Sequence, residues 1–149
     1  MFQLNLPSFP IQLGGTREKP EIFDLLRRRY VKLTPEEWVR QHFVHWLVTE
    51  KGYPKGLLGN EIALQCGSKR LRCDSILYNK QAQPMMIIEY KAPTVALSQK
   101  VFDQVSSYNL LLHVDYLMIS NGMQHFCCRM DYEHRCDSIL PDIPNYEDL

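Results

Sequence analysis

The sequence has no stretch approaching the roughly 18 consecutive apolar residues of a membrane-spanning helix, so we expect no transmembrane segment. Its N-terminus lacks a basic stretch followed by an apolar run, so it does not read as a secretory signal, and a cytoplasmic location is expected. Neither sign of charge is in excess, because 17 Lys and Arg residues balance 17 Asp and Glu residues. A basic coat over the whole protein is therefore excluded, although a local basic groove is not.

Cysteine patterns that hold disulfides or metals are also lacking. The five cysteines are odd in number and include no C-x-x-C pair, so we expect small buried thiols and not a disulfide framework. Histidines and cysteines do gather near the C-terminus, but their spacing matches no standard zinc pattern, which makes zinc the weaker interpretation. This group comprises His125, Cys127, Cys128, His134 and Cys136.

The phosphate-binding pattern G-x-x-x-x-G-K-[ST] of ATPases is absent too, so we expect no ATP site and no ATP-driven translocation by this chain alone. What is present is an ordinary globular composition. With 149 residues, of which 45% are hydrophobic and 23% charged, the chain is predicted to form one domain with its own core. Residues 1–20, rich in Pro and Gly, predict an N-terminal arm, and residues 131–149 predict a C-terminal extension.

The clearest secondary-structure signal is a helix start. Thr34-Pro35-Glu36-Glu37 places Thr at the cap, Pro at the first and Glu at the third helical position. A second helix is predicted to begin at Ser98, whereas residues 21–33 are ambiguous. Helix, three strands, helix and two strands in that order predict an α/β fold around a mixed central β-sheet. The expected strands cover residues 57–65, 69–78, 85–91, 116–120 and 125–130.

Three charged residues stand on two consecutive predicted strands. Asp74 lies on the first of these strands, and Glu89 and Lys91 end the apolar run of the second. Glu89 and Lys91 are two residues apart, so they project from one face, and the hairpin register can bring Asp74 opposite them. Converging carboxylates repel one another, and a hard divalent cation such as Mg²⁺ or Mn²⁺ would resolve that repulsion. The plainer interpretation is a Lys–carboxylate pair at the end of a strand.

These residues resemble the PD-(D/E)xK nuclease superfamily. The Q-x-x-x-Y element Gln104–Tyr108, which follows the E-x-K strand, makes the chain similar to a narrower group, the N-terminal nuclease domain of type I restriction enzyme motor (R) subunits, in the form of a small stand-alone protein. The resemblance covers residues 28–130. The supporting strings are Leu33–Gln41, Glu89–Pro93, Phe102–Gln104 and Ser120–Gly122.

The resemblance implies a restriction-endonuclease-like mixed central β-sheet flanked by helices, and Mg²⁺- or Mn²⁺-dependent cleavage of DNA. It makes Asp74 and Glu89 the metal ligands, the Tyr90 carbonyl a third ligand, and Lys91 the catalytic lysine. It also implies that Gln104 and Tyr108 support the site and contact DNA. Core packing of Tyr108 is an equally good interpretation, since this residue falls on the apolar stripe of its helix.

The family also uses a glutamate from its first helix, and two candidates exist here. Glu36 lies near the apolar face of the helix and is favoured by helical geometry, whereas Glu37 holds the capping-box position. Arg70 and Arg72, which precede Asp74 on its strand, are candidates for contacts with DNA phosphates, and a solvated strand edge is the alternative. DNA, other restriction–modification subunits and a second copy of the chain are the expected partners.

The sequence supports three hypotheses about function. The first is a metal-dependent deoxyribonuclease, whose site contains Asp74, Glu89 and Lys91. The second is a non-catalytic module that keeps the nuclease fold for DNA binding or for docking a partner. The third is an α/β domain in which the charged residues only pair with one another, and it predicts that Asp74 and Glu89 point apart.

Overall fold

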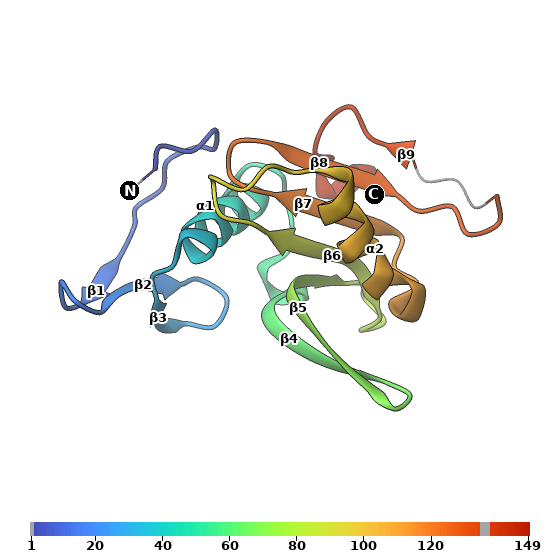
Figure 1. The fold of residues 1–149 in the computed structure, drawn as a ribbon, viewed down its shortest axis with the longest axis horizontal. Helices are drawn as coiled ribbons and strands as arrows, with labels where there is room; N and C mark the ends of the chain where they lie inside the picture. Colours follow the sequence, from blue (N-terminus) through green and yellow to red (C-terminus); the bar gives the residue numbers. More distant parts are fainter. Residues whose placement is uncertain (1, 135–137) are drawn as a thin grey trace.

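The computed structural model describes residues 2–134 and 138–149. Its described part contains two helices, two short 3-10 turns and nine strands in two sheets (Figure 1). The helices are α1 (Pro35–Thr49) and α2 (Gln99–Leu112). The strands are β1 (Leu13–Gly15), β2 (Pro20–Asp24), β3 (Arg29–Lys32), β4 (Leu58–Cys66), β5 (Lys69–Tyr78), β6 (Pro84–Tyr90), β7 (Tyr116–Ser120), β8 (His125–Arg129) and β9 (Ser138–Ile139).

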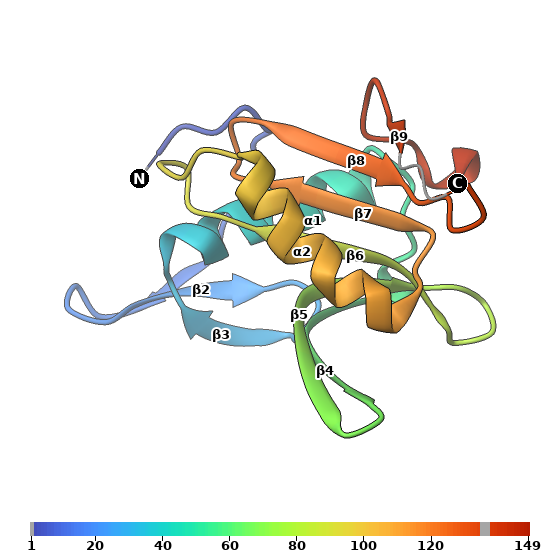
Figure 2. The same cartoon turned by 45° about the vertical axis from the view of Figure 1, so that its right-hand side comes forward.

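The main sheet has the order β4-β5-β6-β7-β8-β9, and its strands are antiparallel except for the parallel pair β6–β7. Helix α2 connects that parallel pair and lies on one face of the sheet, and α1 lies on the other (Figure 2). Met86, Ile87 and Ile88 of β6 are fully buried because both faces of this central strand are covered. The predicted mixed sheet flanked by helices is confirmed.

Helix α1 begins as the sequence predicts. The side-chain oxygen of Thr34 accepts a hydrogen bond from the backbone amide of Glu37, which satisfies one of the free donors of the first turn. Val39, Phe43 and Leu47 then recur along one face and are fully buried against the main sheet. The helix therefore has a fixed rotation, and that rotation decides which of its polar residues face inward.

The N-terminal region differs from the expected arm. Residues 13–32 form a three-stranded antiparallel sheet, β1-β2-β3, and residues 21–33, which were ambiguous, supply two of its strands. The turn between β2 and β3 is held by Asp24, which is fully buried and accepts hydrogen bonds from the amides of Leu26 and Arg27. Because one buried carboxylate stabilises this turn, the pattern of hydrophobic residues in the sequence does not predict it.

The C-terminal extension is docked on the body of the protein. Ile143 is buried in the same core cluster as α1. The hydroxyl of Tyr53 donates to the Pro144 carbonyl over 3.0 Å, and the Tyr146 amide donates to the Lys51 carbonyl over 2.8 Å. Cys136 lies outside the described residues. Within the described part of the chain, no helix is both long enough and apolar enough to cross a bilayer.

Candidate active-site cleft

The candidate site lies where strands β5 and β6 separate. Their backbone pairing ends at Ser75↔Ile88, while β6 continues beside β7 as far as Tyr90↔Ser120. One residue beyond the last pair, the carboxylate of Asp74 accepts a hydrogen bond from the Tyr90 amide over 2.9 Å. A cleft of about 470 Å³ opens at this separation. Its lining includes Glu36, Glu37, Arg40, Glu61, Arg72, Asp74, Glu89, Tyr90 and Lys91.

Asp74 and Glu89 meet in this cleft, as the hairpin register predicts. Burial, the negative charge of Asp74 and a hydrogen bond with its carboxyl together raise the pKa of Glu89 well above its ordinary value of 4.5. The nearby positive charge of Lys91 offsets only part of this shift. The hypothesis of carboxylates that point apart is therefore wrong for Asp74 and Glu89. Glu89 is buried and Asp74 is partly buried, and two acids in contact in this way favour either a proton or a cation between them.

Glu61 is a third acid next to this pair, and the sequence analysis did not select it. The pairs Asn60↔Ser75 and Ile62↔Cys73 enclose Glu61 and Asp74, which places these two acids opposite each other on β4 and β5. The backbone of Glu61 has φ +55°, in the left-handed region that non-glycine residues rarely adopt. Its carboxylate contacts Arg40 and Arg72, each over 2.6 Å, and these two ion pairs offset the cost of that conformation.

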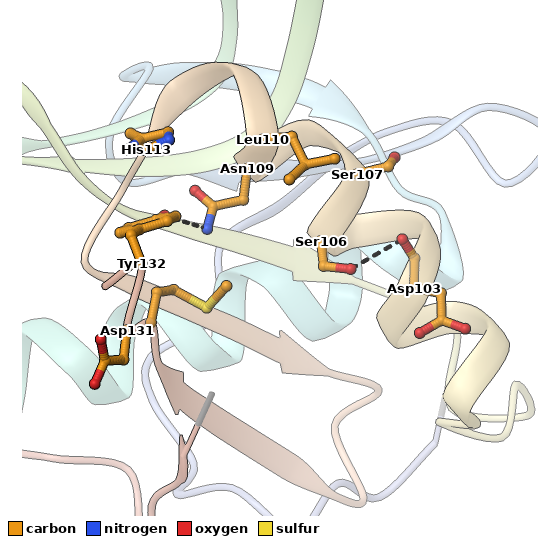
Figure 3. A pocket seen from close by; sticks show the side chains of 9 residues that line it. Asp103, Ser106, Ser107, Asn109, Leu110, His113, Asp131 and Tyr132 are labelled. Carbon is orange, nitrogen blue, oxygen red and sulfur yellow. Dashed lines mark hydrogen bonds between the residues drawn. The ribbon is translucent and has the colours of Figure 1, made fainter. Parts of the chain in front are cut away.

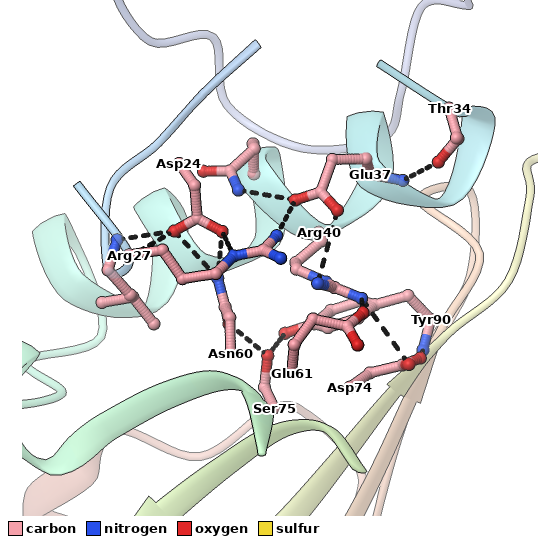
Figure 4. Close-up of polar contacts among 12 residues, drawn as sticks. Asp24, Arg27, Thr34, Glu37, Arg40, Asn60, Glu61, Asp74, Ser75 and Tyr90 are labelled. Atoms are coloured by element: carbon pink, nitrogen blue, oxygen red, sulfur yellow. Dashed lines mark hydrogen bonds and ion pairs between the residues drawn. The ribbon is translucent and has the colours of Figure 1, made fainter. Parts of the chain in front are cut away.

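Arg40 connects the acids of the cleft, and the sequence analysis missed this role as well. The guanidinium is almost completely buried and lies 2.6 Å from Glu61, 3.3 Å from Glu37 and 3.6 Å from Asp74 (Figure 4). Burial lowers the pKa of Arg40, but the surrounding carboxylates, Glu37 foremost, more than offset this and raise it overall. Arg40 also lies 5.6 Å from the centre of the Tyr90 ring. One buried cation thus holds the acids on α1, β4 and β5 together.

Of the two helical glutamates, Glu37 faces inward. It is buried, and its carboxylate accepts hydrogen bonds from Arg27 and Gln41, each over 2.9 Å. Glu36 is exposed where it lines the cleft. The preference for Glu36 as the inward residue is therefore corrected, because the buried stripe of α1 rotates the next position toward the sheet.

A buried series of side-chain hydrogen bonds supports the strands next to the cleft. The Asn60 amide donates to Asp24 over 3.0 Å, Ser75 donates to the Asn60 side-chain oxygen over 2.6 Å, and the Tyr90 hydroxyl donates to Ser75 over 3.0 Å. All four side chains are buried, so these hydrogen bonds are shielded from water. It holds the Tyr90 ring and, with it, the end of β6 from which Glu89 and Lys91 project.

Of the residues expected to contact DNA, some line the cleft and others lie outside it. Arg72 lines the cleft, and its side chain is 73% exposed despite the ion pair with Glu61. Arg70 is exposed on the same strand but outside the cleft lining. Gln104 is exposed on α2 and is likewise not part of the lining. The side chain of Tyr108 lies outside what the structure describes.

A second hollow, of about 530 Å³, lies between α2, from Asp103 onward, and the residues after β8 (Figure 3). Asn109 donates to the hydroxyl of Tyr132 there over 2.5 Å, and His113 stacks on the Tyr132 ring at 4.0 Å. The acids among its described lining residues are Asp103 and Asp131, and the Asp131 carboxylate contacts His134 over 2.8 Å. Those described residues include no lysine, whereas the cleft beside β6 combines the pair Asp74 and Glu89 with Lys91.

The mixed sheet and the cleft in which Asp74 and Glu89 meet define a restriction-endonuclease-like α/β protein. Residues 35–144 match the family described as the type I restriction enzyme R protein N terminus, and the chain belongs to that family. It is similar in fold to a fragment structure assigned to an HsdR subunit of a type I restriction enzyme from Vibrio vulnificus YJ016, with a TM-score of 0.56 and 18% identity. That match covers 78% of this chain and 24% of the other. No curated protein matches the sequence.

Proposed function

We propose that the cleft hydrolyses phosphodiester bonds in DNA with Mg²⁺ or Mn²⁺ as cofactor. The observation that carries this proposal is the meeting of Asp74 and Glu89 beside Lys91, in which the neighbouring acid and burial raise the pKa of Glu89. Membership of the R protein N-terminal family supports it. A paired acid in a polar cleft has no role in core packing, so a ligand is the best physical reason for it.

The donor set fits a hard cation. Asp74 and Glu89 would hold it through carboxylate oxygens, and the Tyr90 carbonyl would add a third oxygen. Among the described residues, no group of three or more His, Cys, Asp or Glu side chains is arranged to hold a metal. Two carboxylates suit Mg²⁺, which keeps several waters and completes its coordination with substrate phosphate. When bound, such an ion polarises the phosphoryl oxygen and lowers the pKa of a bound water.

The other residues of the cleft prepare this chemistry. Lys91 would orient the attacking water and stabilise negative charge on the phosphate. Arg40 and the Tyr90 amide hold the Asp74 carboxylate in place. Glu37 would keep Arg40 in position, and Glu36, an exposed residue of the cleft lining, would contact waters near the reacting phosphate.

We propose contacts with DNA for the residues outside the catalytic pair. Arg72 would bind phosphate beside the cleavage point, and Arg70 would extend that contact along β5. Gln104 and Tyr108 of α2 would approach DNA that extends beyond the cleft. Other restriction–modification subunits are the partners that the family suggests, and a second copy of the chain would provide the second site needed to cut both strands.

Conversion of supercoiled plasmid to nicked and linear forms tests the proposal. The wild-type protein should cut with Mg²⁺ or Mn²⁺ and not with EDTA, and Asp74→Asn should lose that activity. Asp142→Asn is the matched control, because Asp142 is an exposed acid on the C-terminal extension. DNA binding without cleavage under any metal condition would contradict the proposal and favour the non-catalytic module.

A further inference from the structure

The balanced net charge of the protein conceals two basic segments. Residues 13–32 contain six Lys and Arg residues against three acids, and residues 61–72 contain three against one. The rest of the chain contains eight Lys and Arg residues against 13 acids. The first segment forms the sheet β1-β2-β3, and the second spans most of the hairpin formed by β4 and β5. The positive charge is therefore gathered on two structural units.

These two units lie on either side of the candidate cleft. Lys32 and Val31 of β3 line it from one side, and Arg72 of β5 lines it from the other. In both ribbon views the three-stranded sheet lies to the left of the β4–β5 hairpin (Figures 1 and 2). A polyanion that passed through the cleft would therefore meet basic side chains before and after Asp74 and Glu89.

The basic residues of the three-stranded sheet are available to a ligand. Arg28, Arg29 and Lys32 are exposed, and within residues 2–134 and 138–149 none of them forms an ion pair with an acid. Arg27 is different, since Asp24 and Glu37 already neutralise it. The buried Asp24 holds the turn that carries Arg28, so these charges are presented from a fixed backbone.

An aromatic residue stands among these charges. Tyr30 lies between Arg29 and Lys32 on β3, and 46% of it is exposed. Its ring meets Phe23 edge-on at 5.4 Å. It also covers Gly14, where an added Cβ would lie only 2.9 Å from the ring, so a glycine is needed there for this packing. An exposed, fixed tyrosine between basic residues suits a sugar–phosphate backbone, because it offers both a hydroxyl and an apolar face.

We infer that the face of β1-β2-β3 with Arg28, Tyr30 and Lys32 binds the backbone of double-stranded DNA, across the cleft from the β4–β5 hairpin. This inference rests on the proposed function, because it concerns the same cleft. The sheet lies outside residues 35–144, which match the R protein N-terminal family, so family membership does not assign this surface. Contacts of this kind fix the position of DNA and supply no sequence preference.

The test is fluorescence anisotropy of a short labelled DNA duplex with the full chain in EDTA, so that binding is measured without cleavage. The double variant Arg28→Asn/Lys32→Gln removes two charges, and Asn tolerates the φ of +53° at position 28. It should bind about tenfold more weakly at low salt. The slope of log K against log salt should decrease by about two, because each lost phosphate contact removes about 0.9.

Lys80→Gln/Lys100→Gln is the matched control, because both lysines are exposed and neither lines the cleft. Equal affinity and equal slope for the wild type and the Arg28/Lys32 variant would overturn the inference, even if the wild type cleaves plasmid. Displacement of the duplex by an equal charge of polyglutamate would also overturn it, since the surface would then bind any polyanion. If the Arg28/Lys32 variant binds DNA more weakly than the wild type but the wild type never cleaves plasmid, this inference stands and the proposed function is wrong.

Discussion

The backbone amide of Tyr90 donates a hydrogen bond to the carboxylate of Asp74 over 2.9 Å. Asp74 lies one residue and Tyr90 two residues beyond Ser75↔Ile88, the last backbone pair of β5 and β6, so a side chain joins the two strands where their backbone pairing has ended. The end of the β5–β6 ladder therefore produces both the opening of the cleft and a fixed acid within it.

Lys91→Ala should abolish DNA cleavage and preserve the fold. The loss of a cation beside the reacting phosphate is expected to reduce the cleavage rate at least about a hundredfold. The free energy of unfolding should change by less than about 1 kcal/mol, because Lys91 is only partly buried at the rim of the cleft. Plasmid nicking and urea denaturation measure the two effects. Lys80→Ala is the control for removal of a lysine, and equal nicking rates for both variants would show that Lys91 has no catalytic role.

Glu89→Gln should stabilise the metal-free protein at neutral pH. The pKa of Glu89 is higher in the folded than in the unfolded protein, so the folded state retains a proton that the unfolded state loses above about pH 4.5. This group therefore lowers the free energy of unfolding as the pH rises from 4.5 toward its raised pKa. Urea unfolding in EDTA at pH 5 and pH 7.5 should show a smaller decrease for Glu89→Gln than for the wild type.

The control for that pH series is Glu147→Gln, which neutralises an exposed acid. Its unfolding free energy should follow the wild-type pH dependence. Burial lowers the pKa values of His42, His45 and His125 below their ordinary value of 6.5, so these groups raise the free energy of unfolding over the same pH range and act in the opposite direction. The comparison between variants, and not the wild-type slope alone, therefore isolates Glu89. Parallel pH profiles for Glu89→Gln and the wild type would contradict a raised pKa at this position.

Local sequence signals predicted the elements that carry the catalytic candidates. The cap at Thr34 begins α1 where the structure places it, and strand β5 has the predicted bounds Lys69–Tyr78. The spacing of Glu89 and Lys91 and the hairpin register were enough to bring Asp74 to the same cleft. Each of these inferences uses residues that are close in sequence or paired across one turn, which is the range over which periodicity is informative.

The residues that the sequence analysis missed depend on contacts between distant segments. Arg40 could be seen to lie three residues after Glu37, but Glu61 and Asp74 reach it only once β4 and β5 pack against α1. Asp24 shows the same limit, because its partner Asn60 is 36 residues away. Buried polar networks have no periodic pattern in the sequence, so residues 1–20 were predicted as an arm and residues 21–33 were left ambiguous, although the structure places a three-stranded sheet there.

Arg40→Ala should strongly destabilise the protein. The substitution leaves Glu37, Glu61 and Asp74 without their shared buried cation, and removal of one partner from a buried ion network costs about 3–5 kcal/mol. Urea denaturation at neutral pH measures the loss. Arg17→Ala removes an exposed arginine in the turn between β1 and β2 and should change the free energy of unfolding by less than about 0.5 kcal/mol. Similar small effects for both variants would show that the acids of the cleft do not need Arg40.

Metal binding should release a proton from the protein. If Mg²⁺ or Mn²⁺ binds between Asp74 and Glu89, it must displace the proton that the raised pKa of Glu89 retains at neutral pH. The affinity for Mn²⁺ should then increase by up to about tenfold per pH unit over the range in which Glu89 is protonated. Isothermal titration calorimetry in two buffers of different ionisation enthalpy measures the number of protons released. Glu147→Gln should release as many as the wild type, whereas Glu89→Gln should bind weakly and release none. Tight binding without proton release in the wild type would place the metal away from this pair of acids.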